Sequence, residues 1–287
     1  IPDKPSFECF APQPEGAHLP KGAHIVERTN VTGCVQVYFE CDYELFQNKT
    51  TVSATVGYVV GFFNAVSTIY NNESISIIIS QIFVWTTPDN YSTSSSSAAL
   101  NDFVDYRTDF EGDLAHLVGL GGGGLGGIAY LDVLCTSSNY AFSNIHSSNQ
   151  NYPTYSWTVN VVAHEMGHNV VSPHTHWCGW TGGAIDTCGP LAGYPPEGNC
   201  QPGPPPTNGG TIMSYCHLTN YGINFANGFG PQPGNALRDA ITAASCLVAS
   251  CPSNSCTAPT ALTTSGITSN TAIIGWNAPS GATAYDL

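Results

Sequence analysis

Positive charge is scarce in this sequence of 287 residues. It has 6 Lys and Arg residues against 20 Asp and Glu residues, which gives a formal net charge of −14. A polyanion such as nucleic acid is bound by clustered cations, so this balance argues against a nucleic-acid partner. An acidic surface favours the solubility of an extracellular protein, and some of these carboxylates could also bind Ca²⁺. No EF-hand-like pattern or acidic repeat locates a calcium site.

Two further absences concern membranes and cysteine pairs. The chain has no run of eighteen apolar residues, which predicts that it has no membrane span. None of its 11 cysteines forms a CxxC pair, a spacing that is typical of metal and redox sites. Cysteines without that spacing favour disulfide bonds and an oxidising compartment, and so a secreted protein. The odd count leaves one thiol unpaired or paired outside this chain.

The apolar pattern predicts an α/β domain with a mixed, mostly parallel sheet. Alternating or β-branched runs indicate strands, and apolar residues at helical intervals indicate helices. The segment 74–85 is expected to be a strand buried on both faces at its centre. The Gly- and Pro-rich, cysteine-containing stretch 178–235 is expected to be irregular. Strands are predicted at 34–39, 74–85, 113–120, 128–135 and 140–146, and helices at 50–70, 97–110, 155–171 and 236–247.

The chemistry is concentrated in the predicted helix 155–171. Residues 164–168 read His-Glu-Met-Gly-His, an HExxH motif. Residues four positions apart share a helix face, so His164 and His168 can bind one zinc ion together. Glu165 stands beside the first ligand, where it can act as a general base toward a zinc-bound water, whose pKa zinc lowers to about 7.

A third ligand follows the helix. His174 lies six residues beyond His168, and Pro173 directly before it ends the helix. The chain can then turn back and present a third imidazole from a loop. Three histidines leave one open coordination position, which is the arrangement of a catalytic zinc site.

A second motif lies downstream, where residues 211–215 read Thr-Ile-Met-Ser-Tyr. The combination of HExxHxxxxxH with a Met-containing turn resembles the metzincin zinc peptidases. The cysteine-rich stretch after His174 resembles the adamalysin/reprolysin branch and its bacterial relatives, and the likeness covers roughly residues 34–246. It implies that Met213 lies beneath the histidines as a hydrophobic base. It also implies that Tyr215 either stabilises the oxyanion or is only a wall residue.

The same resemblance implies a substrate-binding surface. Residues 128–135 would form the edge strand that binds substrate in extended form. Residues near His217 and Leu218 would shape the pocket beyond the scissile bond. A disulfide between Cys135 and Cys246 would tie the sheet to the closing helix, as similar bridges do in the adamalysins.

Val171 departs from the family pattern, which has Gly three residues after the second histidine. A β-branched residue at positive φ would cost on the order of 1–3 kcal/mol. Either the turn is built differently here or the third ligand is displaced, and His176 is then an alternative ligand. Cys9 also has two interpretations, a disulfide partner or a thiolate that caps the zinc ion and keeps the enzyme latent.

The composition divides the chain into an N-terminal arm (1–30), a metallopeptidase domain (31–250), a linker (251–257) and a C-terminal segment (258–287). The last resembles the start of a fibronectin type III domain, because of a leading Pro259, a strand ending in Trp276 and Tyr285 in the next strand. The resemblance as a whole implies a secreted zinc endopeptidase that acts on proteins or peptides. The alternative is a catalytically silent or latent metzincin scaffold with an extracellular binding or structural role.

Overall fold

The computed structural model of the chain describes residues 31–121, 123–252, 260–266, 268 and 273–277. The predicted N-terminal arm, Cys9 and Tyr285 lie outside these residues. The chain divides into two compact units, within residues 1–251 and 252–287. This division falls inside the segment interpreted as a linker, and the assignment of the units to domains stays a prediction.

The first unit is built on a five-stranded sheet with the strand order β2-β1-β3-β5-β4. Neighbouring strands are parallel except for β4, which is antiparallel to β5. The predicted fold class, a mixed and mostly parallel sheet with helices, is therefore confirmed. The strands are β1 (Cys34–Cys41), β2 (Ser76–Val84), β3 (Leu114–Gly119), β4 (Gly127–Ala129) and β5 (Tyr140–Asn144).

Three of the described α-helices begin after a short polar side chain that accepts a hydrogen bond from the first turn. The Thr51 hydroxyl accepts from the N–H of Ala54, and the Ser95 hydroxyl accepts from the N–H of Ala98. The α-helices are α1 (Tyr43–Lys49), α2 (Val52–Asn72), α3 (Ser96–Tyr106), α4 (Trp157–Val170), α5 (Cys188–Ala192) and α6 (Pro231–Ala243). Two 3₁₀ turns, η1 (Cys216–Leu218) and η2 (Phe225–Asn227), lie before α6.

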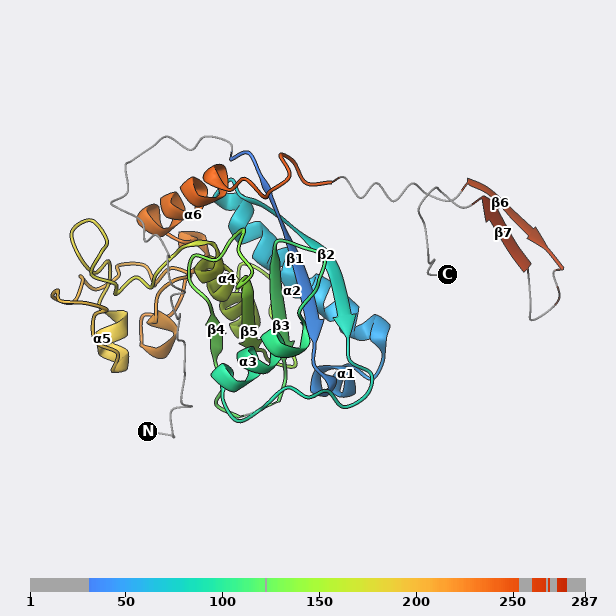
Figure 1. Cartoon of the computed structure of the whole chain (residues 1–287), viewed down its shortest axis with the longest axis horizontal. Helices are drawn as coiled ribbons and strands as arrows, with labels where there is room; N and C mark the ends of the chain where they lie inside the picture. The colour runs from blue at the N-terminus through green and yellow to red at the C-terminus, as the bar shows by residue number, and fades with distance from the viewer. Residues whose placement is uncertain (1–30, 122, 253–259, 267, 269–272, 278–287) are drawn as a thin grey trace. The chain divides into compact units, whose positions relative to one another are not determined.

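Helices cover both faces of the sheet (Figure 1). Alternate residues of a strand point to opposite faces of the sheet, so successive residues of β1 belong to two different cores. Val37 and Phe39 belong to the larger core, with α2 and α4 on one face. Tyr38 belongs to the smaller core, with α3 on the other face. Because α4 contacts β4 and β5, it runs along the antiparallel end of the sheet.

Among the described residues, α2 alone is long and apolar enough to cross a membrane by length and composition. Several of its apolar residues instead contribute to the main core, so its composition has a structural explanation in this fold. The expected absence of a membrane span stays a prediction. The buried apolar residues of α2 are Val59, Phe62, Phe63, Ala65, Val66, Ile69 and Tyr70.

Two strand predictions need correction. The strand β2 is not buried on both faces, because it lies at the edge of the sheet and most of its residues are half-exposed. The strand predicted at 128–135 ends at Ala129. Beyond it the backbone turns through positive φ at Asp132 and Cys135, while Leu131 and Val133 are buried. The apolar pattern there came from a buried loop rather than from a strand.

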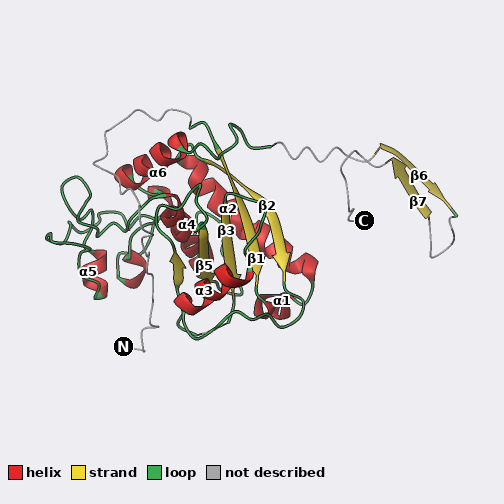
Figure 2. Cartoon of the chain, in the orientation of Figure 1, coloured by secondary structure: helices red, strands yellow, loops and turns green. Residues whose placement is uncertain are grey.

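The chain between α4 and α6 is mostly loop, as predicted for this disulfide-rich part (Figure 2). Two disulfides, Cys178–Cys200 and Cys188–Cys216, lie within it. The predicted Cys135–Cys246 bond is confirmed, and Cys34–Cys251 is a fourth. Cys41 is a buried free thiol.

In the second unit, the strands β6 (Thr260–Ser265) and β7 (Ile273–Asn277) form an antiparallel pair. Trp276 lies in β7, as expected for a strand near the end of the chain.

Candidate active site

The side chains of three histidines, His164, His168 and His174, converge near the C-terminal end of α4. His164 and His168 lie one turn apart on this helix, and His174 follows it in a loop. The Nε2 atom of His168 is 3.0 Å from that of His164 and 3.1 Å from that of His174. Ligand nitrogens at about 2.0–2.1 Å from a tetrahedral zinc ion lie roughly 3.3 Å apart. The three atoms therefore have close to the spacing that a single metal ion requires.

The turn after α4 resolves the question raised by Val171. Its φ is 175°, an extended value that any residue adopts, so the strain that a positive φ would cause does not arise. The helix closes when the N–H groups of Val171 and Ser172 both donate to the carbonyl of Gly167. The structure thus places His174 with His164 and His168, by a turn of a different construction.

Each of these imidazoles makes a hydrogen bond through its other ring nitrogen. The Nδ1 atom of His164 is 2.7 Å from the carbonyl oxygen of Ile212, and that of His168 is 2.7 Å from the carbonyl oxygen of Ser172. The Nδ1 atom of His174 is 2.5 Å from a carboxylate oxygen of Glu197. A carbonyl or ionised carboxylate oxygen only accepts, so each Nδ1 carries the proton and each Nε2 presents a lone pair.

Burial keeps the three rings neutral. It lowers the pKa of His164 to about 4, and it holds the pKa values of His168 and His174 well below the usual range, helped by the neighbouring histidines. Neutral imidazole is the form that binds a metal. Three lone pairs that point at one another repel, and a cation between them removes that repulsion. The donor set therefore fits a zinc ion, and nitrogen donors of this kind suit it.

Glu165 is fully buried beside these histidines. Its carboxylate lies against the backbone of β4, where a Cβ atom added to Gly127 would be 2.3 Å from Oε1 of Glu165. Only a residue without a side chain leaves this space, so Gly127 positions the carboxylate by its lack of a Cβ atom. Sequence reasoning did not identify this glycine.

Met213, predicted to lie beneath the histidines as an apolar support, packs against α4. Met213 is fully buried, and a Cβ atom added to Gly167 would be 2.7 Å from its Sδ atom. Gly167 lies on α4 between the two helical histidines, so the Met213 side chain packs directly against the turn of the helix that carries them. The carbonyl of Met213 accepts a hydrogen bond from the N–H of Thr175, which ties the loop that carries His174 to this turn.

Tyr215 is buried and lies among the histidines. Its ring centroid is 4.7 Å from that of His174, 4.8 Å from that of His176 and 6.4 Å from that of His164. The alternative ligand His176 stacks on His174 and places its Nε2 atom 3.4 Å from Glu197. His176 therefore stands behind His174 instead of replacing it among the three converging nitrogens.

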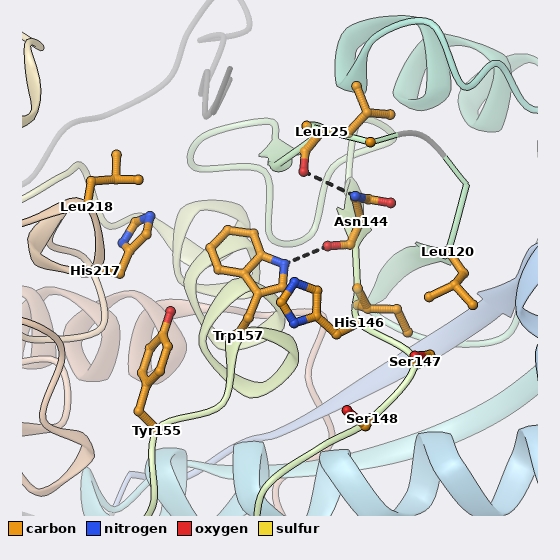
Figure 3. A pocket seen from close by; sticks show the side chains of 13 residues that line it. Leu120, Leu125, Asn144, His146, Ser147, Ser148, Tyr155, Trp157, His217 and Leu218 are labelled. Carbon is orange, nitrogen blue, oxygen red and sulfur yellow. Dashed lines mark hydrogen bonds between the residues drawn. The ribbon is translucent and has the colours of Figure 1, made fainter. Parts of the chain in front are cut away.

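A cavity of about 680 Å³ adjoins this site (Figure 3). Trp157 lines the cavity: its indole N–H donates to the carbonyl of Asn144, and its ring centroid is 5.4 Å from that of His217. Trp157 begins α4 two turns before His164, roughly 10 Å along the axis. His217 and Leu218, predicted to shape a pocket, both line this cavity. His146 lines it too.

Glu197 is the other residue of the site that sequence reasoning missed. It lies 23 positions beyond His174 and no motif contains it. One signal was available, because Asp186 and Glu197 are the only carboxylates between residues 178 and 235.

Comparison with known proteins identifies a family through a family model, whereas the similar solved structures have low sequence identity. Two solved structures are similar at low identity. One, titled "Structure of a chaperone-substrate complex", is 13% identical with a TM-score of 0.46, and the match covers 74% of this chain and 34% of that chain. The other, metalloproteinase-II from Bacteroides fragilis, is 16% identical with a TM-score of 0.37, and the match covers 54% of this chain and 46% of that chain. The chain thus spans less than half the length of either structure. The comparison with curated proteins finds no match.

A family model carries the assignment. Residues 31–223 match the Reprolysin_5 model, described as metallo-peptidase family M12. This range is more than half of the chain and contains both the histidine motif and the Met-containing turn. It ends before residues 258–287, so their resemblance to a fibronectin type III domain stays a prediction. The chain belongs to metallo-peptidase family M12, as its likeness to the metzincins implied.

Proposed function

We propose that this protein is a secreted, zinc-dependent endopeptidase that hydrolyses peptide bonds in proteins or peptides. The observation that carries the proposal is the convergence of three neutral histidines, His164, His168 and His174, beside the buried carboxylate of Glu165. The family supports a zinc peptidase in general, and this geometry supports an intact catalytic set.

The three histidines would hold the metal through their Nε2 atoms. A bound zinc ion supplies a Lewis acid and lowers the pKa of a coordinated water to about 7. Glu165 takes the proton of the attacking water and passes it to the nitrogen of the leaving amine. Its enclosed position against β4 holds the carboxylate in place for this transfer.

Tyr215 would donate a hydrogen bond to the negative charge that develops on the substrate carbonyl oxygen. Its place against the His174 ring supports this role, which requires a hydroxyl donor near the reacting carbonyl. Met213 would act on the site only through packing, by supporting the turn of α4 that carries the histidines.

Substrate would bind along β4 and in the adjoining cavity. In the described sheet, β4 is an edge strand that pairs with β5 on one side, and its other side faces away from the sheet. An extended peptide can add to such an edge by main-chain hydrogen bonds. The cavity around Trp157 and His217 would then receive a side chain beyond the scissile bond.

Four disulfides support an extracellular location, because such bonds persist in oxidising compartments. No described feature locates a calcium site.

The test is hydrolysis of a denatured protein by the full chain, with and without a zinc chelator, beside Glu165→Ala. Cleavage that the chelator abolishes, that added Zn²⁺ restores and that the variant lacks would support the proposal. No cleavage by folded, zinc-loaded protein would contradict it and favour the latent or silent scaffold. Calorimetric or chelator-competition measurement of bound zinc separates that outcome from a protein that binds no metal.

A further inference from the structure

The carboxylate of Glu197 approaches the third histidine from the side away from the metal-facing nitrogen. Its Oε1 atom is 2.5 Å from Nδ1 of His174, and the two side chains are 40% and 4% exposed. His164 and His168 use neutral backbone carbonyls for the same purpose. His174 is thus the only one of the three whose Nδ1 proton goes to a charged acceptor.

This difference has a chemical consequence. A hydrogen bond to an ionised acceptor is roughly twice as strong as one between neutral groups. It fixes the tautomer and the ring orientation, and it raises the basicity of the opposite nitrogen toward a metal. His174 needs such support most, because it stands on a loop rather than on α4.

The loop that carries Glu197 is tied to the segment after His174. The N–H of Glu197 donates to the carbonyl of His176, and the N–H of Cys178 donates to the carbonyl of Glu197. The Cys178–Cys200 disulfide closes the same loop three residues beyond Glu197. Backbone pairing and a covalent link therefore hold the backbone of Glu197 beside His176, within reach of the His174 ring.

The same three groups, His174, His176 and Glu197, could also be taken for a second metal site. The distances argue against it. Two ligand atoms on one zinc ion lie roughly 3.3 Å apart, whereas 2.5 Å between Nδ1 and Oε1 is a hydrogen-bond distance.

We propose that Glu197 is a positioning residue that orients His174 and strengthens its bond to zinc, so that the loop closed by Cys178–Cys200 is part of the metal site. The proposal rests on the proposed zinc-peptidase function, and it concerns the order and affinity of the third ligand rather than the reaction itself.

The experiment compares the full chain with Glu197→Ala and Glu197→Gln. Zinc affinity is measured by competition with a chromophoric chelator, and ligand geometry by the visible spectrum of the Co²⁺-loaded protein. Glu197→Ala is expected to weaken zinc binding by about 10- to 100-fold and to change the Co²⁺ spectrum. Glu197→Gln keeps an acceptor oxygen without its charge, so the loss should be smaller. Gln201→Ala, at an exposed position directly after Cys200, is the control and should change neither quantity.

Thermal unfolding of the metal-free proteins separates positioning from folding. Equal unfolding temperatures together with the graded loss of affinity would support the proposal. Unchanged affinity and an unchanged Co²⁺ spectrum in Glu197→Ala would overturn it while leaving the peptidase intact. A second zinc equivalent that only the wild type binds would also overturn it, in favour of a second metal site. A wild type that binds no zinc would overturn the proposed function as well.

Discussion

The carboxylate of Glu165 lies so close to β4 that a single methyl group on Gly127 would displace it. The added Cβ atom would be 2.3 Å from Oε1 and 2.7 Å from both Cδ and Cγ of Glu165. Ordinary contacts between such atoms begin near 3.4 Å, so the carboxylate must move by about 1 Å. Since Glu165 is fully buried, it cannot make this movement freely.

Gly127→Ala is therefore expected to lower kcat by about 10²-fold, which corresponds to roughly 2.7 kcal/mol in the activation free energy. The backbone of Gly127 does not have a positive φ, so alanine is compatible with the strand. Overpacking costs about 1–3 kcal/mol of stability, so the assay belongs well below the unfolding temperature. Zinc affinity should stay unchanged, because the three atoms nearest the added Cβ all belong to Glu165 and none to a histidine.

Steady-state kinetics of the single variants and of Gly127→Ala with Glu165→Gln form a double-mutant cycle. If the methyl group acts only through the carboxylate, it should cause no further loss once Glu165 is replaced. Additive losses would refute the reasoning, because the methyl group would then act elsewhere, for example on substrate at the strand edge. Gly61→Ala is the control: its added Cβ atom meets nothing within 4 Å. This variant should keep full activity and gain about 1 kcal/mol of helix stability.

Three further predictions concern other residues of the molecule. Tyr215→Phe is expected to lower kcat about 10²-fold with little change in KM if the hydroxyl stabilises the oxyanion, and unchanged kinetics would identify a wall residue. Arg238→Ala breaks a buried ion pair with Glu73, whose Nη1–Oε2 distance is 2.6 Å, and should cost about 3–5 kcal/mol in urea unfolding, with activity retained in the folded protein. Burial lowers the pKa of His116 from 6.5 to about 3, so below about pH 6.5 the unfolded chain binds the additional proton and stability falls as the pH falls toward about 3. His116→Gln should make this part of the stability–pH curve less steep in urea titrations at stepped pH, and an unaltered slope would contradict the assignment.

The parts of the site that depend on local geometry were predictable. His164 and His168 share a face because a helix repeats every 3.6 residues, and the apolar spacing around them indicated a helix. The end of that helix before Pro173 was also predictable from local geometry, because proline cannot continue a helix. The Cys135–Cys246 disulfide could be expected only from the family resemblance.

The mistaken expectations depended on what lies beside a segment. Residues 128–135 have a strand-like apolar pattern, yet Leu131 and Val133 are buried as a loop, with backbone hydrogen bonds from residues 132–134 to the end of α4. A buried loop and a buried strand both require apolar residues, so composition alone cannot distinguish the loop from the strand. At Val171 the family pattern left two alternatives, and the turn is the differently built one: it closes through two hydrogen bonds to Gly167 and has an extended φ.

The sequence by itself determined the helix and the shared face of His164 and His168 on it, because both follow from short spacing along one backbone. Only the tertiary structure decided that His174 rather than His176 joins them, that Gly127 positions Glu165 and that Glu197 supports His174. These three contacts join segments that no periodicity relates. They exist because the sheet, the packing against α4 and the loop closed by Cys178–Cys200 bring those segments within hydrogen-bonding or van der Waals distance.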